Sequence, residues 1–518
     1  MQIYARKLSK KRTAVMVRES YRENGKVKTR ILKYFGISHS EEELKKLKEK
    51  AYYEKKKLTG KIKKPIKVNL SKLTEKDRVT EGFHDVFEKL FDELGLETCF
   101  SKVRYNQLKD VIIARIANPT SKLHTSKILK KDFQKKLSED QIYNLMDKMI
   151  EKEDDIKAKI FESTQRFTPN EAINILYFDV TTLYFESQKP DELKEFGYSK
   201  DGKKGEVQVV LALATNEHGL PIGYHLFPGN TAEVKTLLKS LSAWKKIVPI
   251  KNVRIIADRA MMSENNLSEI EESNNHYVIA AKLKAMPKIL KTEILKMNET
   301  NSSKHVIKEF SYKGRRLIVE YSPERAIKDK SDRERLIQKI KTKIGLKTKT
   351  RKLITNNGYL KYMDEEKKGE VVFNEDKIKE ETLWDGLHGI ITNDFKADAK
   401  ELRAQYKRLW VIEESFRINK HSLSMRPIYH FKPKRIKAHI LLCYLAFSLY
   451  RSLQMKLKLN NLSMSLERVR EELAHIQASI LEDPKTGEMY RMPSSLTKEM
   501  KLIYKMLEIR HMSTASVL

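Results

Sequence analysis

Cysteine is scarce in this chain: its 518 residues include only Cys99 and Cys443, far apart in sequence. This scarcity excludes a disulfide framework, argues against a structural zinc site and predicts a reducing compartment. Long apolar runs are also missing, because the most apolar stretch, residues 440–449, is about half as long as a membrane span. The first residues, MQIYARKLSKKR, lack the apolar core of a signal peptide. We therefore expect a soluble intracellular protein with no membrane partner.

Negative charge is in short supply as well. Lysine and arginine number 103 against 70 aspartates and glutamates, for a net charge of +33. An excess of this size favours a polyanionic partner, nucleic acid above all, because bound phosphates release their counterions. A Lys-rich genome is the alternative explanation. The length alone predicts about three or four domains.

The first part of the chain carries a hairpin signal. In residues 13–36, two runs of period two flank Asn24-Gly25, which is typical of a two-residue type I′ turn. Basic residues follow on the second strand, so the hairpin either contacts DNA or is a ribbon with a polar face. A charged helix (41–57) and a Lys/Pro linker (59–67) are predicted next. From 82 to 167 the pattern is helical, which suggests a DNA-end-binding module or plain helical packing.

At Ala172 the pattern changes from helices to strands. The predicted order is β-β-β-α-β-α, a mixed sheet flanked by helices and thus an α/β architecture. Asp179 and Asp258 each end a buried apolar run, ILYF and RIIA, and begin a polar stretch. We predict a turn at Asp179 and a strand end at Asp258. For either aspartate alone, a cap or turn role is the simpler interpretation.

A third carboxylate lies on a predicted long helix, YKRLWVIEESFRINK (406–420). At about 100° per residue, Tyr406, Glu413 and Lys420 share one face. Glu413 lies at the edge of the apolar stripe, whereas Glu414 turns about 100° away and is expected to be solvated. Residues 284–384, which mix strands with a charged helix, interrupt the α/β order before this helix.

Two strand-end aspartates and a helical glutamate together suit two Mg²⁺ or Mn²⁺ ions, since these hard cations take oxygen ligands. Two such ions support in-line phosphoryl displacement. The set resembles bacterial insertion-sequence transposases of the DDE class, in particular the group with a Tyr-Arg-Glu-Lys helix motif. The resemblance rests on YFDVTTL, ADRAMMS, GYSKDGKKGEVQVVLAL, GLPIGYHLFPGN, Y-x-x-L-W-x-I-E-E-x-F-R-x-x-K and RPIYHFKPKRIKAHI, which together cover most of 170–450.

The resemblance implies a ribonuclease H-like fold, two divalent metal ions in each active site, and a homodimer on paired transposon ends. Its DNA partners are the terminal inverted repeats and the target. By position it assigns Asp179, Asp258 and Glu413 as catalytic metal ligands, and Tyr406 and Lys420 as phosphate contacts. It also places the protein in the prokaryotic cytoplasm, associated with the nucleoid.

This chain departs from the motif at two places. The motif's arginine is Leu409 here, and Arg417, about 40° from Glu413 on an ideal helix, is the candidate substitute. The glycine that often follows the second Asp-Arg is Ala260. Arg259 either binds DNA or pairs with an acid. Trp384 either stacks on a flipped base or packs in an apolar core.

The predicted function is a cut-and-paste DNA transposase. A structure-specific nuclease on the same fold and a non-catalytic DNA-binding derivative are the alternatives. The predicted architecture is an α/β ribonuclease H-like core interrupted by a β-rich insertion, preceded by a β-hairpin and helical DNA-binding region and followed by a helical C-terminus. Its boundaries are 1–66 (hairpin plus helix), 67–168 (helical), 169–283 (core, first part), 284–384 (insertion), 385–455 (core, second part) and 456–518 (helical C-terminus).

Overall fold

A computed structural model describes residues 2–9, 12–23, 26–58, 73–167, 174–198, 205–249, 252–300, 304–345, 361–365, 371–484 and 486–518. It divides the chain into two compact units. The larger unit comprises Arg78–Ala478 and Ser494–His511. The smaller unit comprises Met1–Asp77, Ser479–Pro493 and Met512–Leu518. Among the residues in these ranges, no helix is long and apolar enough to cross a membrane.

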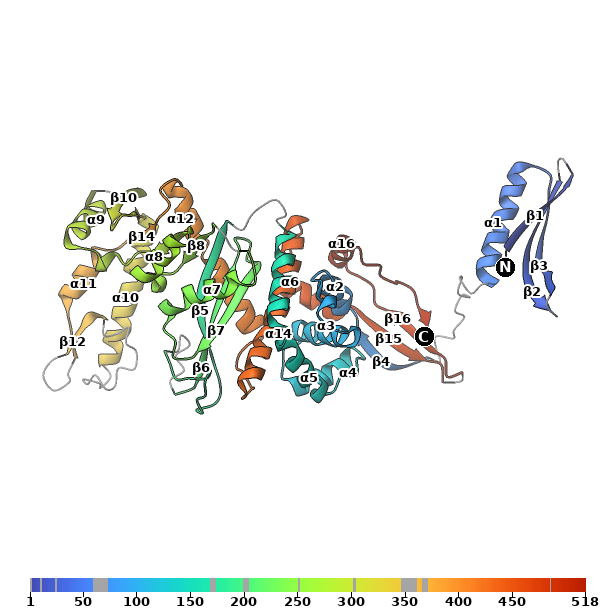
Figure 1. The fold of residues 1–518 in the computed structure, drawn as a ribbon, viewed down its shortest axis with the longest axis horizontal. Helices are drawn as coiled ribbons and strands as arrows, with labels where there is room; N and C mark the ends of the chain where they lie inside the picture. Colours follow the sequence, from blue (N-terminus) through green and yellow to red (C-terminus); the bar gives the residue numbers. More distant parts are fainter. Residues whose placement is uncertain are drawn as a thin grey trace. The chain divides into compact units, whose positions relative to one another are not determined.

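The larger unit is built on an eight-stranded mixed sheet with the order β10-β11-β14-β9-β8-β5-β6-β7 (Figure 1). β5, β6 and β7 form an antiparallel meander, and β8 and β9 run parallel to β5. β14, β11 and β10 extend the other edge in antiparallel fashion. The strands are β5 (Ile175–Tyr184), β6 (Gln208–Thr215), β7 (Pro221–Pro228), β8 (Arg254–Ala257), β9 (His276–Ala280), β10 (Val306–Tyr312), β11 (Arg315–Tyr321) and β14 (Leu387–Thr392).

Helices cover both faces of this sheet, as the apolar pattern of its strands requires. All eight residues of β6 are buried, which is typical of a strand covered on both sides. α7 (Thr236–Lys245) and α8 (Glu264–Glu272) pack on one face. α12 (Ala399–Lys407), α13 (Trp410–Arg417) and α14 (Pro433–Leu459) supply side chains to the core on the other. Ser263 caps α8 by accepting a hydrogen bond from the backbone N–H of Asn266.

In the described part of the larger unit, five helices precede the sheet and pack around α14, which is buried along most of its length (Figure 1). This confirms the helical pattern predicted for 82–167. The helices are α2 (Gly82–Asp92), α3 (Lys102–Ala117), α4 (Lys122–Asp132), α5 (Glu139–Ile150) and α6 (Glu153–Gln165). The chain then enters the sheet through β5.

Two strands of the predicted insertion, β10 and β11, join the main sheet rather than forming a sheet of their own. The insertion also contains α9 (Lys288–Thr300), which the sequence reasoning missed, and α10 (Pro323–Gly345). It ends with the hairpin β12 (Met363–Glu365) and β13 (Val371–Phe373) and with α11 (Glu375–Thr382). The predicted domain boundaries stay predictions.

The predicted turn at Asp179 is wrong, because β5 runs through it without a break to Tyr184. Antiparallel pairing with β6 over Tyr177–Tyr184 holds the strand straight. The predicted long helix over 406–420 is also wrong. It is divided into α12, a turn at Arg408 and Leu409, α13, and a π-helical turn, η8 (Ile418–Ser422).

The smaller unit begins with a three-stranded antiparallel sheet, β1 (Gln2–Ser9), β2 (Arg12–Glu23) and β3 (Lys26–Ser38), followed by α1 (Glu41–Leu58). β2 and β3 confirm the predicted hairpin, although Asn24 and Gly25 lie outside the described residues, as does the linker 59–67. β1 was not predicted.

A second sheet has the order β17-β16-β15-β4. Its strands are β4 (Thr74–Thr80), β15 (Gln477–Glu482), β16 (Met489–Pro493) and β17 (Ser516–Val517). The predicted helical C-terminus therefore contains strands as well as the helices α15 (Leu466–His475) and α16 (Lys498–Met506). These strands are short, and their partner β4 lies about 400 residues away in sequence, so no local pattern identifies them.

Candidate active site

Asp179 and Asp258 lie side by side because of strand register. β5 and β8 run parallel and pair Phe178 with Ala257, so each aspartate is the next residue after the last registered pair. Each carboxylate accepts a hydrogen bond through Oδ1 from the backbone N–H of the following residue, at 2.7 Å. Since side chains alternate along strands, both aspartates point to the face that also carries Tyr177 and Ile256.

Glu413 approaches this face of the sheet from α13. Ile412 and Phe416 of α13 pack in the same core as Tyr177 and Ile256, which fixes the helix over β5. Asp179, Asp258 and Glu413 together line one cavity of about 1280 Å³ within the larger unit. The structure thus brings the three predicted carboxylates to one place.

The broken helix decides which motif residues reach the cavity. Tyr406 at the end of α12 and Glu413 both line it, whereas Lys420 does not. On an ideal helix, Lys420 would share a face with Glu413, seven residues before it. The π-helical turn changes the rotation per residue and so moves Lys420 off that face. The turn between α12 and α13 is held by Arg408, whose guanidinium donates to the carbonyl of Glu217 at 2.7 Å.

Tyr406 lies among charged groups. Burial raises the pKa of Tyr406 above its usual range, and the carboxylates of Asp258 and Glu413 raise it further. The phenol is therefore a hydrogen-bond donor at neutral pH. His388 of β14 packs against Tyr406 with ring centroids 5.2 Å apart. Burial, aided by Arg325 and Lys407, lowers the pKa of His388 to about 4, so its ring is neutral.

Arg325 belongs to the site, and the sequence reasoning missed it. It lies in the first turns of α10, lines the same cavity, and acts electrostatically on both Tyr406 and His388. Its nearest carboxylate partner is Asp329, at 3.6 Å. No sequence pattern indicated that this part of the insertion reaches the cavity that Asp179, Asp258 and Glu413 line.

Arg417 does not line the cavity. Its side chain is 71% exposed and lies 3.9 Å from Glu414. The expectation that Glu414 is solvated is also wrong. Arg451 of α14, whose side chain is 2% exposed, donates to Glu414 at 2.9 Å. Because an unpaired buried guanidinium is costly, Glu414 serves as its counter-ion.

The remaining predicted residues, Arg259 and Trp384, both line the cavity. Arg259 is exposed, directly after Asp258. Trp384 is partly buried and also packs on the apolar cluster of the insertion, so both roles weighed for it remain. Trp410, the first residue of α13 and part of the helix motif, is 56% exposed and lines the cavity too, although it was not predicted as a site residue.

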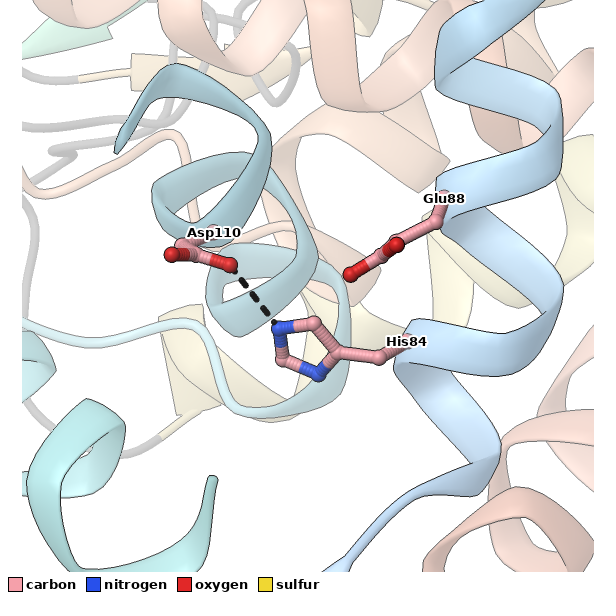
Figure 2. Close-up of side chains that lie close together, drawn as sticks. All are labelled: His84, Glu88 and Asp110. Atoms are coloured by element: carbon pink, nitrogen blue, oxygen red, sulfur yellow. Dashed lines mark hydrogen bonds and ion pairs between the residues drawn. The ribbon is translucent and has the colours of Figure 1, made fainter. Parts of the chain in front are cut away.

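A different group of side chains could hold a metal ion: His84 and Glu88 of α2 and Asp110 of α3, shown in Figure 2. Their ligand atoms all lie within 4.8 Å of one another. His84 Nε2 lies 3.2 Å from Asp110 Oδ1, and Lys109 and Lys135 lie 3.6 and 3.8 Å from Glu88 and Asp110. Lys109 also lies 3.1 Å from Asp92, so these side chains are part of a wider ion-pair network.

The family follows from comparison with known proteins. Residues 171–449, more than half of the chain, match the model of the transposase DDE domain. The chain therefore belongs to the DDE transposases. Residues 3–65 match the N-terminal domain of IS1634 family transposases, which makes this an insertion-sequence transposase, a DNA-cleaving and strand-transferring enzyme. This agrees with the leading prediction rather than with its two alternatives.

Other comparisons add little. No curated protein matches the chain. One solved structure with similarity is a piggyBac transposase synaptic complex with hairpin DNA, at 10% identity and a TM-score of 0.37. The similarity covers 76% of this chain and 77% of that one. A likeness this distant carries no argument about the present fold or chemistry.

Proposed function

We propose that Asp179, Asp258 and Glu413 are the catalytic carboxylates of this transposase. They would hold two divalent ions, Mg²⁺ or Mn²⁺. The observation that carries the proposal is their convergence: a parallel register aligns the two aspartates, and α13 brings the glutamate to the same cavity. The strand order β7-β6-β5-β8-β9, with the first three strands antiparallel, supports a ribonuclease H-like core.

The donor set fits such ions, since all three groups offer carboxylate oxygens to hard cations. The number of ions is carried over from the resemblance to the family. When bound, the ions supply Lewis-acid stabilisation of an in-line displacement at phosphorus.

Around the carboxylates, the chain supplies groups suited to a DNA phosphate. The protonated Tyr406 phenol donates a hydrogen bond, and neutral His388 supports its ring without adding charge. Arg325 takes the phosphate contact that the motif gives to an arginine and that Leu409 cannot make. Arg259 adds a second guanidinium at the cavity. A phosphate contact for Lys420 stays a prediction from the resemblance.

The reaction is hydrolysis at the transposon end followed by attack of the freed 3′-hydroxyl on target DNA, by a cut-and-paste route. The resemblance further suggests that a homodimer pairs the two terminal inverted repeats, and that the protein acts in the cytoplasm at the nucleoid. Imperfect inverted repeats bounded by a short direct duplication beside the coding region would support the assignment as a transposase that acts on terminal inverted repeats.

The test is Mg²⁺-dependent cleavage of duplex DNA that carries the flanking end. Asp258→Ala should lower the cleavage rate by about a thousandfold or more, because transition-state charge loses its stabilisation. Glu401→Gln is the matched control: Glu401 lies on α12, its side chain is 53% exposed, and it does not line the cavity. Unchanged cleavage by Asp258→Ala would show that the site assignment is wrong.

A further inference from the structure

The three-stranded sheet of the smaller unit has two unlike faces. One face packs on α1, where Val15 and Val17 of β2 form a small core with Ala51. Residues directly opposite each other on paired strands point to the same side. Ile3 pairs with Val17 and therefore shares the helix side, and Leu32 and Phe35 of β3 join the same core.

The alternate residues form the outer face, which points away from α1. Met16 pairs with Tyr4 on one side and with Tyr34 on the other, and Arg18 pairs with Ile31. Continuing in register, the outer face consists of Gln2, Tyr4 and Arg6 of β1, Ala14, Met16, Arg18, Ser20 and Arg22 of β2, and Val27, Thr29, Ile31, Tyr34 and Ile37 of β3.

The charge of the outer face has one sign. Arg6, Arg18 and Arg22 lie on it, and none of its positions within the described strands is acidic. Glu19, the acid next to Arg18 in sequence, lies on the helix side, where Arg30 donates to it at 2.8 Å. A single-signed surface of this kind attracts a polyanion.

Apolar and aromatic side chains lie exposed among these arginines. Val27 is 66%, Ile31 60% and Tyr34 51% exposed. The guanidinium of Arg18 stacks on the ring of Tyr4, 3.7 Å from its centroid, which holds the charge in a fixed orientation. This combination suits the major groove of DNA. There, apolar side chains can contact thymine methyl groups, and guanidiniums can donate hydrogen bonds to the acceptors of guanine.

We propose that the outer face of β1–β2–β3 is a DNA-reading surface that lies in the major groove of duplex DNA. Three strands at a spacing of about 4.8 Å span a width close to that of the groove, roughly 12 Å. Arg6, Arg18 and Arg22 contact phosphates and guanines, and Ile31 and Tyr34 contact base edges. The inference rests on the chain being a DNA transposase, but it does not depend on the carboxylate site.

The test measures binding of the full chain to duplex DNA from directly beside the coding region, by fluorescence anisotropy in EDTA at several salt concentrations. EDTA separates binding from the chemistry of the cavity. The triple variant Arg6→Gln/Arg18→Gln/Arg22→Gln should bind at least about tenfold more weakly. The slope of log K against log salt concentration should become less steep by about 2 to 3, since each lost phosphate contact reduces the slope by about 0.9.

Arg30→Gln is the matched control, because it removes the same charge from the helix side of the same sheet. It should bind within about twofold of the unchanged chain. Ile31→Ser should lower the preference for flanking DNA over a random duplex without changing the salt dependence, since it removes a base contact rather than a phosphate contact. If the triple variant fails to fold, the single variants Arg6→Gln and Arg22→Gln replace it, because both of these arginines are exposed.

Equal binding by the triple variant and the unchanged chain would overturn the proposal. Equal losses in the triple variant and Arg30→Gln would also overturn it, since they would indicate a general charge effect. If the outer-face variants changed the oligomeric state in light scattering while DNA binding stayed the same, the face would belong to a contact between copies of the chain.

Discussion

Asp179 and Asp258 are the first residues after the last registered pair of two parallel strands, Phe178 of β5 and Ala257 of β8. From this point β5 continues beside β6, with Asp179 opposite Leu213, whereas β8 stops and its chain turns into a short 3-10 helix. The sheet therefore loses a strand on one side of Asp179. That opening is where the cavity forms and where Glu413 approaches.

A divalent metal ion bound by the carboxylates of this cavity should increase the stability of the folded chain. Adding Mg²⁺ to the full chain is expected to raise the thermal midpoint, because a ligand that binds the folded form at a hundred times its Kd contributes about 2.7 kcal/mol. Asp258→Asn should lose most of this rise and leave the metal-free midpoint unchanged or higher, because it removes repulsion between like charges. Differential scanning calorimetry measures both.

Asp110→Asn tests the other group of possible metal ligands, His84, Glu88 and Asp110. It should keep the full Mg²⁺ shift, because Glu88 and Asp110 already form ion pairs with Lys109 and Lys135. If Asp110→Asn lost the shift and Asp258→Asn kept it, the metal would belong to the helical region instead of the cavity.

Two adjacent glutamates on α13 should behave in opposite ways. Glu413→Gln is expected to abolish cleavage with little effect on stability, because Glu413 is exposed at the cavity. Glu414→Gln should cost about 3 kcal/mol of unfolding free energy, because it leaves the guanidinium of Arg451 buried without a counter-ion. Cleavage rates and thermal midpoints of the two variants give the comparison. Equal losses of stability would contradict it.

Arg325 and Arg417 are competing substitutes for the arginine that Leu409 replaces. Arg325→Ala should reduce strand transfer by about ten- to a hundredfold, the loss expected for a charge-assisted phosphate contact worth roughly 1.5–3 kcal/mol. Arg325→Lys should recover part of the rate. Arg417→Ala should leave strand transfer unchanged, because its side chain is directed to solvent near Glu414. A loss confined to Arg417→Ala would restore the prediction made from the ideal helix.

Lys122 gives the larger unit a pH-dependent stability. Its ammonium is buried beside His439 and Arg115, and burial lowers its pKa to about 7. From about pH 7 to 10.5 the unfolded chain therefore binds a proton that the folded chain does not, so stability rises with pH by up to 1.4 kcal/mol per unit. Lys122→Met should raise the thermal midpoint most at or below pH 7 and flatten the rise above it.

Lys127→Met provides the control for this pH series, since Lys127 is an exposed lysine on the same helix, α4. Its profile between pH 6 and 10 should run parallel to that of the unchanged chain. If Lys122→Met also ran parallel, Lys122 would be protonated to the same extent in the folded and unfolded chains.

Local pattern identified the parts of this site whose cause is local. The apolar runs before Asp179 and Asp258 placed each aspartate where a strand meets a polar stretch, and the apolar stripe of residues 406–420 placed Glu413 on a helix beside a core. The same reasoning predicted the helices of 82–167 and the first hairpin. In each case hydrophobic periodicity within about ten residues carries the information.

Contacts between distant segments decided the rest. β5 stays extended through Asp179 because β6 pairs with it, and the helix of residues 406–420 breaks at Arg408, which donates to Glu217 in the turn between β6 and β7. Glu414 pairs with Arg451, and Arg325 reaches the cavity from an insertion about 90 residues earlier. The sequence by itself predicted the three carboxylates and the class of transposase, and the family comparison confirmed the class. The tertiary structure determined which cations accompany them, because ion pairs and helix breaks depend on partners that sequence spacing does not reveal.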